Sequence, residues 1–243
     1  MRKIFFILFI FFCARHASAQ FISKGLIEFE RKTNQHAMMD ENSIWDAAAM
    51  KTTPQFVTSY FDLRFDNGHT SYKPGREPAV KQQKFWGIFP AENQVAMNLD
   101  SNTLAMSKSI EGNNFLINDS LNKITWKIGS DTRTIAGFEC RKAVGKIFDS
   151  VVVVAFYTDE IVPSGGPESF SGLPGMILGV AIPRLHTTWY ATKLQLVDVS
   201  SKDLEIPKKG KKMSMPEFKK QVNTLFNSQE DPHLEEKKWQ TIL

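Results

Sequence analysis

The sequence has little cysteine to hold a fold together. Its 243 residues contain two cysteines, Cys13 and Cys140, and Cys13 lies in an N-terminal leader. The chain without this leader therefore cannot form an intrachain disulfide, although an oxidising compartment would permit one. A single thiol is more often a small buried apolar group than a nucleophile. We expect Cys140 to lie on a strand and face the core, on the same side as Phe138 and Lys142.

Common motifs of catalysis and cofactor binding are also missing. The sequence contains no G-x-S-x-G, H-E-x-x-H, Walker or C-x-x-C pattern. Asp159 and Glu160 are adjacent, so in a strand they would point to opposite faces and would not work as one acid–base pair. Outside the leader four histidines remain, and none shows the spacing of metal ligands: His36, His69, His186 and His233. The sequence predicts no metal, no cofactor and no catalytic residue.

A long apolar run occurs only at the N-terminus, where it has the features of a secretory signal peptide. Met1–Lys3 is basic, Ile4–Cys13 is apolar, and Ala17-Ser18-Ala19 places small residues before Gln20. The run is shorter than the ~20 residues that span a bilayer. We expect residues 1–19 to be removed and residues 20–243 to form a single β-rich domain that is secreted across the inner membrane. Its expected location is the periplasm or the periplasmic face of the outer membrane.

Two features that could suggest surface attachment are weak. Lipidation at Cys13 is disfavoured because Phe12 stands where a lipoprotein signal has a small residue. The basic run Lys208–Lys212 could contact anionic lipid or an acidic partner, but a solvated loop is the simpler interpretation. Removal of the leader also takes away three cations and no acid, so the net charge falls from +4 to +1. This charge does not indicate a nucleic-acid partner.

The apolar periodicity predicts a mainly β protein. Gly25–Arg31 alternates apolar and charged residues, and Phe56–Phe65 is rich in aromatic residues. Asp66-Asn67-Gly68 predicts a hairpin turn, after which Ser71–Tyr72 begins the return strand. From Phe85 to Val154 short β-type segments follow one another, among them FWGIF, KITWKI and TRTIAGFECRKAVGKI. No long amphipathic helix interrupts them, so we expect an antiparallel meander.

Helical patterns flank these strands on both sides. Asp40–Lys51 is rich in alanine, with Asp40 as a cap and Ile44 and Ala48 on one face. Residues 215–229 begin near Pro216 and place four apolar residues on one stripe: Phe218, Val222, Leu225 and Phe226. Leu234–Ile242 is a second C-terminal helix. The expected fold is a curved antiparallel sheet or half-barrel, with the N-terminal helix and one or two C-terminal helices packed on it.

A stretch rich in glycine and proline precedes the last apolar strand. Gly165-Gly166-Pro167 predicts a turn that presents Phe170 inward. In Gly172-Leu173-Pro174-Gly175, a type II turn requires Gly175 to have a positive φ. Met176–Ile182 is almost entirely apolar and predicts a buried strand. We expect the stretch to be chiefly structural, with Phe170 and Leu173 packed against the sheet.

These motifs resemble the GLPGLI family of secreted envelope proteins of Gram-negative bacteria. The strings GPESFSGLPGMIL, AFYTDEI, TRTIAGFECRKA and GLIEFER carry the resemblance over most of the mature chain. Two positions depart from the family pattern: Met176 replaces a leucine and Phe156 replaces a tryptophan, and both changes conserve apolar packing. The matched positions are Gly166, Pro167, Phe170, Gly172, Leu173, Pro174, Gly175, Ile177 and Leu178, with Cys140, Lys142 and Ala143 upstream.

Two functions of different classes fit the sequence. The resemblance implies a non-enzymatic envelope protein that engages an apolar ligand or an outer-membrane partner, such as a TonB-dependent receptor. The alternative is a hydrolase or a metal-handling protein that uses Cys140, His186, Asp159 and Glu160. The alternative requires Cys140, His186 and a carboxylate to converge in one cleft, which the sequence alone does not decide.

Overall fold

The computed structural model describes residues 21–80, 82, 93–110, 112–148, 150–205, 207–226 and 234–243. The predicted leader, the FWGIF segment, residues 227–229 of the first predicted C-terminal helix and His233 lie outside these residues. No helix within them is both long enough and apolar enough to cross a membrane.

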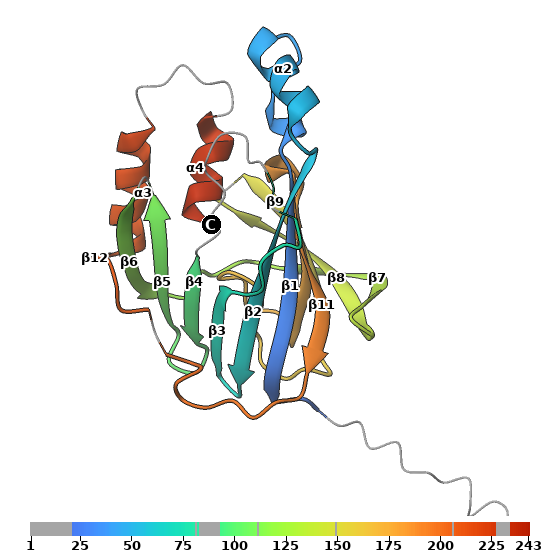
Figure 1. Ribbon diagram of the computed structural model, residues 1–243. Helices are drawn as coiled ribbons and strands as arrows, with labels where there is room; N and C mark the ends of the chain where they lie inside the picture. Colours follow the sequence, from blue (N-terminus) through green and yellow to red (C-terminus); the bar gives the residue numbers. More distant parts are fainter. Residues whose placement is uncertain are drawn as a thin grey trace, which may run out of the picture.

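Within the described residues, twelve strands form one large open sheet, which confirms a mainly β fold (Figure 1). The strands are β1 (Lys24–Asn34), β2 (Phe56–Asp66), β3 (His69–Pro74), β4 (Gln94–Asn98), β5 (Thr103–Ile110), β6 (Asn113–Ser120), β7 (Lys127–Ile135), β8 (Phe138–Ile147), β9 (Val151–Thr158), β10 (Met176–Ile182), β11 (Thr187–Gln195) and β12 (Lys211–Met213). The helices are α2 (Ile44–Thr52), α3 (Met215–Leu225) and α4 (Leu234–Ile242), with short 3-10 turns η1 (His36–Met38) and η2 (Pro183–Leu185).

The sheet consists of two antiparallel meanders that meet at β1. Its strand order is β12-β6-β5-β4-β3-β2-β1-β11-β10-β9-β8-β7, so β1 pairs with β2 on one side and with β11 on the other. The expected antiparallel pairing is confirmed for every neighbouring pair except one. Part of the basic run forms β12, which pairs in parallel with β6 at the edge of the sheet.

Sequence-local signals place several elements correctly. Asn67-Gly68 joins β2 to β3 as the expected hairpin, and Asn67 has a φ of 47°. β10 has the predicted limits, and all its residues except Ala181 are buried. A second tight hairpin, at Ala136-Gly137, divides the TRTIAGFECRKAVGKI segment into β7 and β8; both turn residues have positive φ.

One face of the sheet carries the main apolar core. On β1 and β2 the inward residues Phe29 and Phe61 lie directly opposite each other, and Phe61 stacks on Tyr72 of β3 with ring centroids 4.7 Å apart. The two C-terminal helices lie side by side at one end of the core (Figure 1). Phe218 of α3 is fully buried and meets Phe115 of β6 edge-on, at a centroid distance of 5.6 Å.

The N-terminal helix forms but does not pack on the sheet as predicted. α2 is capped by Ser43, whose hydroxyl accepts a hydrogen bond from the Asp46 backbone, and so begins later than the expected cap at Asp40. No residue of α2 is buried, and Ile44 and Trp45 are 85% and 84% exposed. Figure 1 shows α2 standing beyond the end of the sheet. Its alanines favour a helix, but its large apolar side chains Ile44 and Trp45 are left exposed and do not pack on the sheet.

The KITWKI segment is also not the strand that its residues suggest. Strand β7 begins only at Lys127. Before it, Trp126 is half-buried and donates a hydrogen bond from its indole nitrogen to the Ser171 carbonyl at 2.9 Å. This contact holds residues 122–126 against the glycine- and proline-rich stretch, so they do not pair with a strand of the sheet.

Candidate functional site

Residues 165–175, which we call the Gly/Pro loop, cover part of the inner face of the sheet. Phe170 and Leu173 are 2% and 1% exposed, and Phe170 meets Trp189 of β11 edge-on at 6.2 Å between ring centroids. The loop is fixed at its start by the Ile177 backbone, which donates to the Gly165 carbonyl at 2.8 Å. A Cβ atom on Gly166 would lie 2.8 Å from the Ile177 Cβ, so only glycine fits there.

The end of the Gly/Pro loop turns differently from the type II turn predicted. Gly175 has a positive φ of 133°, as expected. Its N–H donates to the Leu173 carbonyl at 2.8 Å, which closes a three-residue turn. A four-residue turn would need the Met176 N–H, but that group donates to the Ile161 carbonyl at 3.0 Å. A Cβ on Gly175 would lie 2.1 Å from the Thr158 carbonyl oxygen.

Glu168 in this loop reaches a group of buried polar side chains. Glu168 has a φ of 50°, an uncommon conformation for a residue other than glycine, and is 1% exposed. Its carboxylate accepts a hydrogen bond from Asn93 Nδ2 at 3.1 Å. We define the buried charge cluster as Arg31, Lys108 and Glu168 together with Asn93, Tyr72 and Trp189, all of which are at most 3% exposed.

The strand register brings these side chains together from four strands. Arg31 of β1 lies directly opposite Trp189 of β11, and Tyr72 comes from β3. On β5, Lys108 follows Leu104 and Met106 at every second position, so it shares their inward face. The result is two cations and one carboxylate in a region that excludes solvent.

Burial is the main influence on the ionisation of the buried charge cluster. It raises the pKa of Glu168, and the positive charges of Lys108 and Arg31 oppose this shift. It lowers the pKa of Lys108 to about 8, against the attraction of Glu168. The Nζ of Lys108, the Oε1 of Glu168 and the hydroxyl of Tyr72 lack hydrogen-bond partners among the described residues. Trp189 lies close enough to Glu168 to lower the carboxyl pKa slightly, although its Nε1 is not in hydrogen-bond geometry.

The space left beside the buried charge cluster is small. A cavity of about 10 Å³ is lined by Arg31, Glu168 and Trp189, among others. A volume of about 10–15 Å³ holds one water molecule. The cluster is therefore a packed polar core and not a site for an organic ligand.

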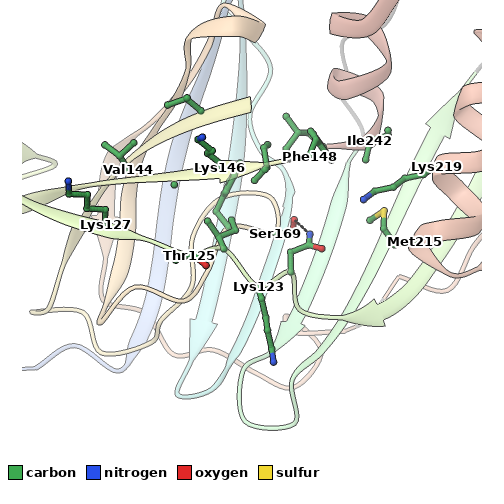
Figure 2. Close-up of a pocket in the computed structure, with 17 residues that line it drawn as sticks. Lys123, Thr125, Lys127, Val144, Lys146, Phe148, Ser169, Met215, Lys219 and Ile242 are labelled. Atoms are coloured by element: carbon green, nitrogen blue, oxygen red, sulfur yellow. Dashed lines mark hydrogen bonds between the residues drawn. The ribbon is translucent and has the colours of Figure 1, made fainter. Parts of the chain in front are cut away.

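A much larger opening lies on the other side of the Gly/Pro loop. Its volume is about 700 Å³, within the range of ligand pockets of roughly 300–1,000 Å³. We call it the lysine groove because four lysines line it and no described lining residue is acidic: Lys123, Lys127, Lys146 and Lys219. Figure 2 shows Lys146 of β8 and Lys219 of α3 on opposite sides of Phe148. Lys219 Nζ lies 5.4 Å from the centre of the Phe148 ring.

The lining of the lysine groove is otherwise mostly apolar. Its buried part is formed by Phe170, Met215, Ile242 and Leu243, and its open part by Ile124, Val144, Phe148 and Val152. Val144 and Val152 are 36% and 41% exposed, so both add apolar surface at the opening of the groove. An apolar trough edged by cations can hold an extended apolar group that ends in an anion.

Gly145 of β8 allows one wall of the groove to form. A Cβ atom at this position would lie 2.7 Å from Ile124 and 2.9 Å from the Trp126 ring. Only glycine therefore lets residues 122–126 lie directly on β8. On the opposite wall, Ser169 of the Gly/Pro loop accepts a hydrogen bond from Asn122 Nδ2 at 3.4 Å, so the same loop supports both the groove and the buried charge cluster.

The residues proposed for a hydrolase or metal site do not meet in one cleft. Asp159 and Glu160 are exposed at the end of β9, where Asp159 pairs with Arg141 at 2.9 Å. Cys140 lies at the same end of β8 and is fully buried, as predicted, with a pKa raised by burial to about 11. His186 is exposed beyond the other end of β10. Seven residues separate the two ends, which is about 20 Å along a strand.

Two of the described histidines contact polar groups of nearby residues. His36 Nε2 contacts the Thr53 carbonyl at 3.0 Å, and His69 Nε2 contacts Asn98 Nδ2 at 3.0 Å. Within the described residues no three of the His, Cys, Asp and Glu side chains are grouped so that they could hold a metal ion.

The charged side chains of both sites were not predicted from the sequence. Glu168 lies inside the GPESF string but was not among the matched positions. The alternation of side chains along two strands could have indicated the buried cations. Lys108 continues the inward series of Leu104 and Met106 on β5. Arg31 continues the inward series of Ile27 and Phe29 on β1. A charged residue at an inward position predicts a buried partner of opposite charge. The lysines of the groove come from separate elements, and no local pattern links them.

The comparisons with known proteins concern the fold and one short region. Residues 145–179 match a family described as "Protein of unknown function (Porph_ging)", a stretch that runs from Gly145 through the Gly/Pro loop to Gly179. A search of curated proteins finds no match. Two crystal forms of PNGF-II are similar in structure, at 16% identity and TM-scores of 0.53 and 0.54. They align with 82% and 81% of this chain, but the chain spans only about a third of their length (33% and 32%), and the likeness shows a shared fold alone.

Proposed function

We propose that the protein is a non-enzymatic binding protein of the cell envelope, which holds an anionic amphipathic ligand in the lysine groove. The observation that carries this proposal is the composition of the groove: about 700 Å³, a largely apolar lining and four lysines without an acidic residue among the described lining. A fatty acid or another single-chain lipid with an anionic head group has the matching chemistry.

The apolar lining supplies the affinity in this proposal. Burial of apolar surface contributes roughly 25 cal/mol per Å² removed from water. Phe148, Val144 and Val152 offer such surface at the opening, while Met215 and Phe170 form the deeper part. The lysines set the preference for an anion, because a carboxylate near Lys146 or Lys219 gains an attraction that a neutral head group lacks.

The envelope location and an outer-membrane partner belong to the same proposal. The N-terminal leader and the resemblance to GLPGLI proteins support secretion into the periplasm. There a protein that carries an amphipathic ligand could deliver it to an outer-membrane partner, such as a TonB-dependent receptor. Cys140 on β8 and His186 beyond the far end of β10 are well separated, which weighs against the hydrolase or metal-handling alternative.

Isothermal titration of the mature chain with dodecanoate, below its micelle concentration, tests the proposal. We expect saturable binding at one site, and weaker binding of dodecanol because it lacks the charge. The double variant Lys146→Glu/Lys219→Glu should lose affinity by about tenfold or more, equivalent to about 1.4 kcal/mol.

The matched control is Lys51→Glu/Lys202→Glu, which changes the net charge equally at exposed lysines outside the groove. This control should bind dodecanoate like the wild type. Equal losses in both double variants would show that the net charge and not the groove attracts the ligand, and an absence of saturable binding would refute the proposal.

A further inference from the structure

Three members of the buried charge cluster carry the functional groups that a covalent reaction between side chains requires. Asn93 Nδ2 donates to Glu168 Oε2 at 3.1 Å, and Lys108 is close enough to Glu168 for each to shift the other's pKa. Lys108 and Asn93 are each 2% exposed and Glu168 is 1% exposed. The cluster thus brings together a primary amine, a carboxamide and a carboxyl group away from solvent.

The strand register places the amine beside the carboxamide. Gln94, the first residue of β4, pairs with Ser107 of β5. Asn93 precedes β4, and continuing the same register by one position beyond the strand brings it opposite Lys108. Directly opposite residues in an antiparallel pair have Cβ atoms about 4.5–5.5 Å apart and point to the same face. The Lys108 side chain is long enough to reach the Asn93 side chain from there, and its Nζ has no hydrogen-bond partner among the described residues that would hold it elsewhere.

We propose that Lys108 and Asn93 form an intramolecular isopeptide bond, with Glu168 transferring the proton. In this step the neutral Lys108 Nζ attacks Asn93 Cγ, the Cγ–Nζ bond forms, and the Cγ–Nδ2 bond breaks. One proton leaves Nζ, and Nδ2 departs with it as ammonia. No oxidant or reductant is involved, and the products are a secondary amide and one molecule of ammonia.

Glu168 is positioned to carry this proton. Its Oε2 already contacts the leaving group Nδ2, while its Oε1 has no hydrogen-bond partner among the described residues and can accept the proton from Nζ. The buried surroundings favour the step because the attacking amine must be neutral, and burial lowers the pKa of Lys108 to about 8. Exclusion of water also prevents hydrolysis of Asn93 from competing.

Mass spectrometry of the denatured mature protein tests the bond. Cleavage before aspartate should separate Asn93, in residues 66–99, from Lys108, in residues 100–118, because Asp100 lies between them. We expect one species that contains both fragments, carries two free N-termini and is lighter than their sum by one ammonia. Trypsin should also fail to cut after Lys108, because an acylated lysine is not a substrate.

Glu168→Gln and Lys108→Met are the controls, and both should release the two fragments separately. The linked fragments matter more than the mass of the intact chain, since cyclisation of Gln20 or succinimide formation at Asn67-Gly68 also releases ammonia. Recovery of residues 66–99 and 100–118 as separate fragments of unmodified mass from the folded wild-type protein would overturn the proposal. That result does not depend on whether the variants fold.

Discussion

Glu168 and Ser169 are neighbours in the chain but belong to opposite environments. Glu168 faces the buried charge cluster, where one carboxylate lies beside Arg31 and Lys108 and the free space holds about one water molecule. Ser169 lines the lysine groove, where four lysines surround about 700 Å³ of open space. The difference shows how position decides the role of a charge: inside the sheet a cation must be paired by the protein, whereas at the groove it is available to a ligand.

The largest expected loss of stability comes from disturbing the Gly/Pro loop, which contributes to both the buried charge cluster and the lysine groove. Gly175→Val would place a Cβ 2.1 Å from the Thr158 carbonyl oxygen and force a branched residue to a φ of 133°. Backbone strain and overpacking, at about 1–3 kcal/mol each, should together cost up to about 6 kcal/mol of unfolding free energy. Thermal melting measures the change. Gly137→Ala is a useful contrast, because Gly137 also has a positive φ but no atom lies within 4 Å of its added Cβ; if both variants melt alike, the close approach to Thr158 has no role.

A smaller effect should separate the two environments directly. Glu168→Ala leaves Arg31 and Lys108 buried without their carboxylate and should cost about 3–5 kcal/mol. Ser169→Ala removes only an acceptor at 3.4 Å from Asn122 and should cost about 1 kcal/mol or less. Urea denaturation of both variants gives the comparison. A similar loss for the two substitutions would mean that Glu168 does not balance the buried cations.

The smallest expected effect is the pH dependence due to Cys140. Its folded pKa is raised to about 11 from an ordinary value of 9.0, so the folded state keeps the thiol proton longer than the unfolded state. The associated stability is present below pH 9 and is lost as the pH rises from 9 to 11, by on the order of 2 kcal/mol. The slope of unfolding free energy against pH in that window should be shallower for Cys140→Ala. An unchanged slope, or rapid labelling of the native thiol at pH 8, would show that Cys140 is accessible.

The sequence predicted those parts of the fold that depend on local patterns. The Asn67-Gly68 hairpin, the limits of β10 and the helix at Leu234–Ile242 follow from turn chemistry and apolar spacing. The Ser214–Glu217 capping box starts α3 just before the predicted Pro216. Local patterns gave a wrong prediction where distant residues set the environment of a segment. Trp126 was predicted to lie in a strand, but its indole hydrogen-bonds to the carbonyl of Ser171, 45 residues away.

Neither functional region could be read from one stretch of sequence. The buried charge cluster needs the register of β1, β3, β5 and β11, which sets Arg31 opposite Trp189. The lysine groove combines β8, α3 and residues 122–127, which are distant in the chain. Cys140 was predicted to be buried from the alternation of side chains along its own strand and from the tendency of a single thiol to lie in the core. The partners of Glu168, in contrast, depend on which strands pair.

The place of β1 in the sheet has a consequence for the order in which the protein can fold. β1 hydrogen-bonds to β2, which follows it closely in the chain, and to β11, which ends at Gln195. During synthesis the first meander can assemble early, but β1 then presents an unpaired edge with Ile27 and Phe29 on its apolar face until β11 emerges. Closing such a long loop is slow compared with forming a hairpin. The nascent chain therefore passes through a half-sheet that is prone to pair with other strands, and a chaperone that covers this edge should raise the yield of folded protein.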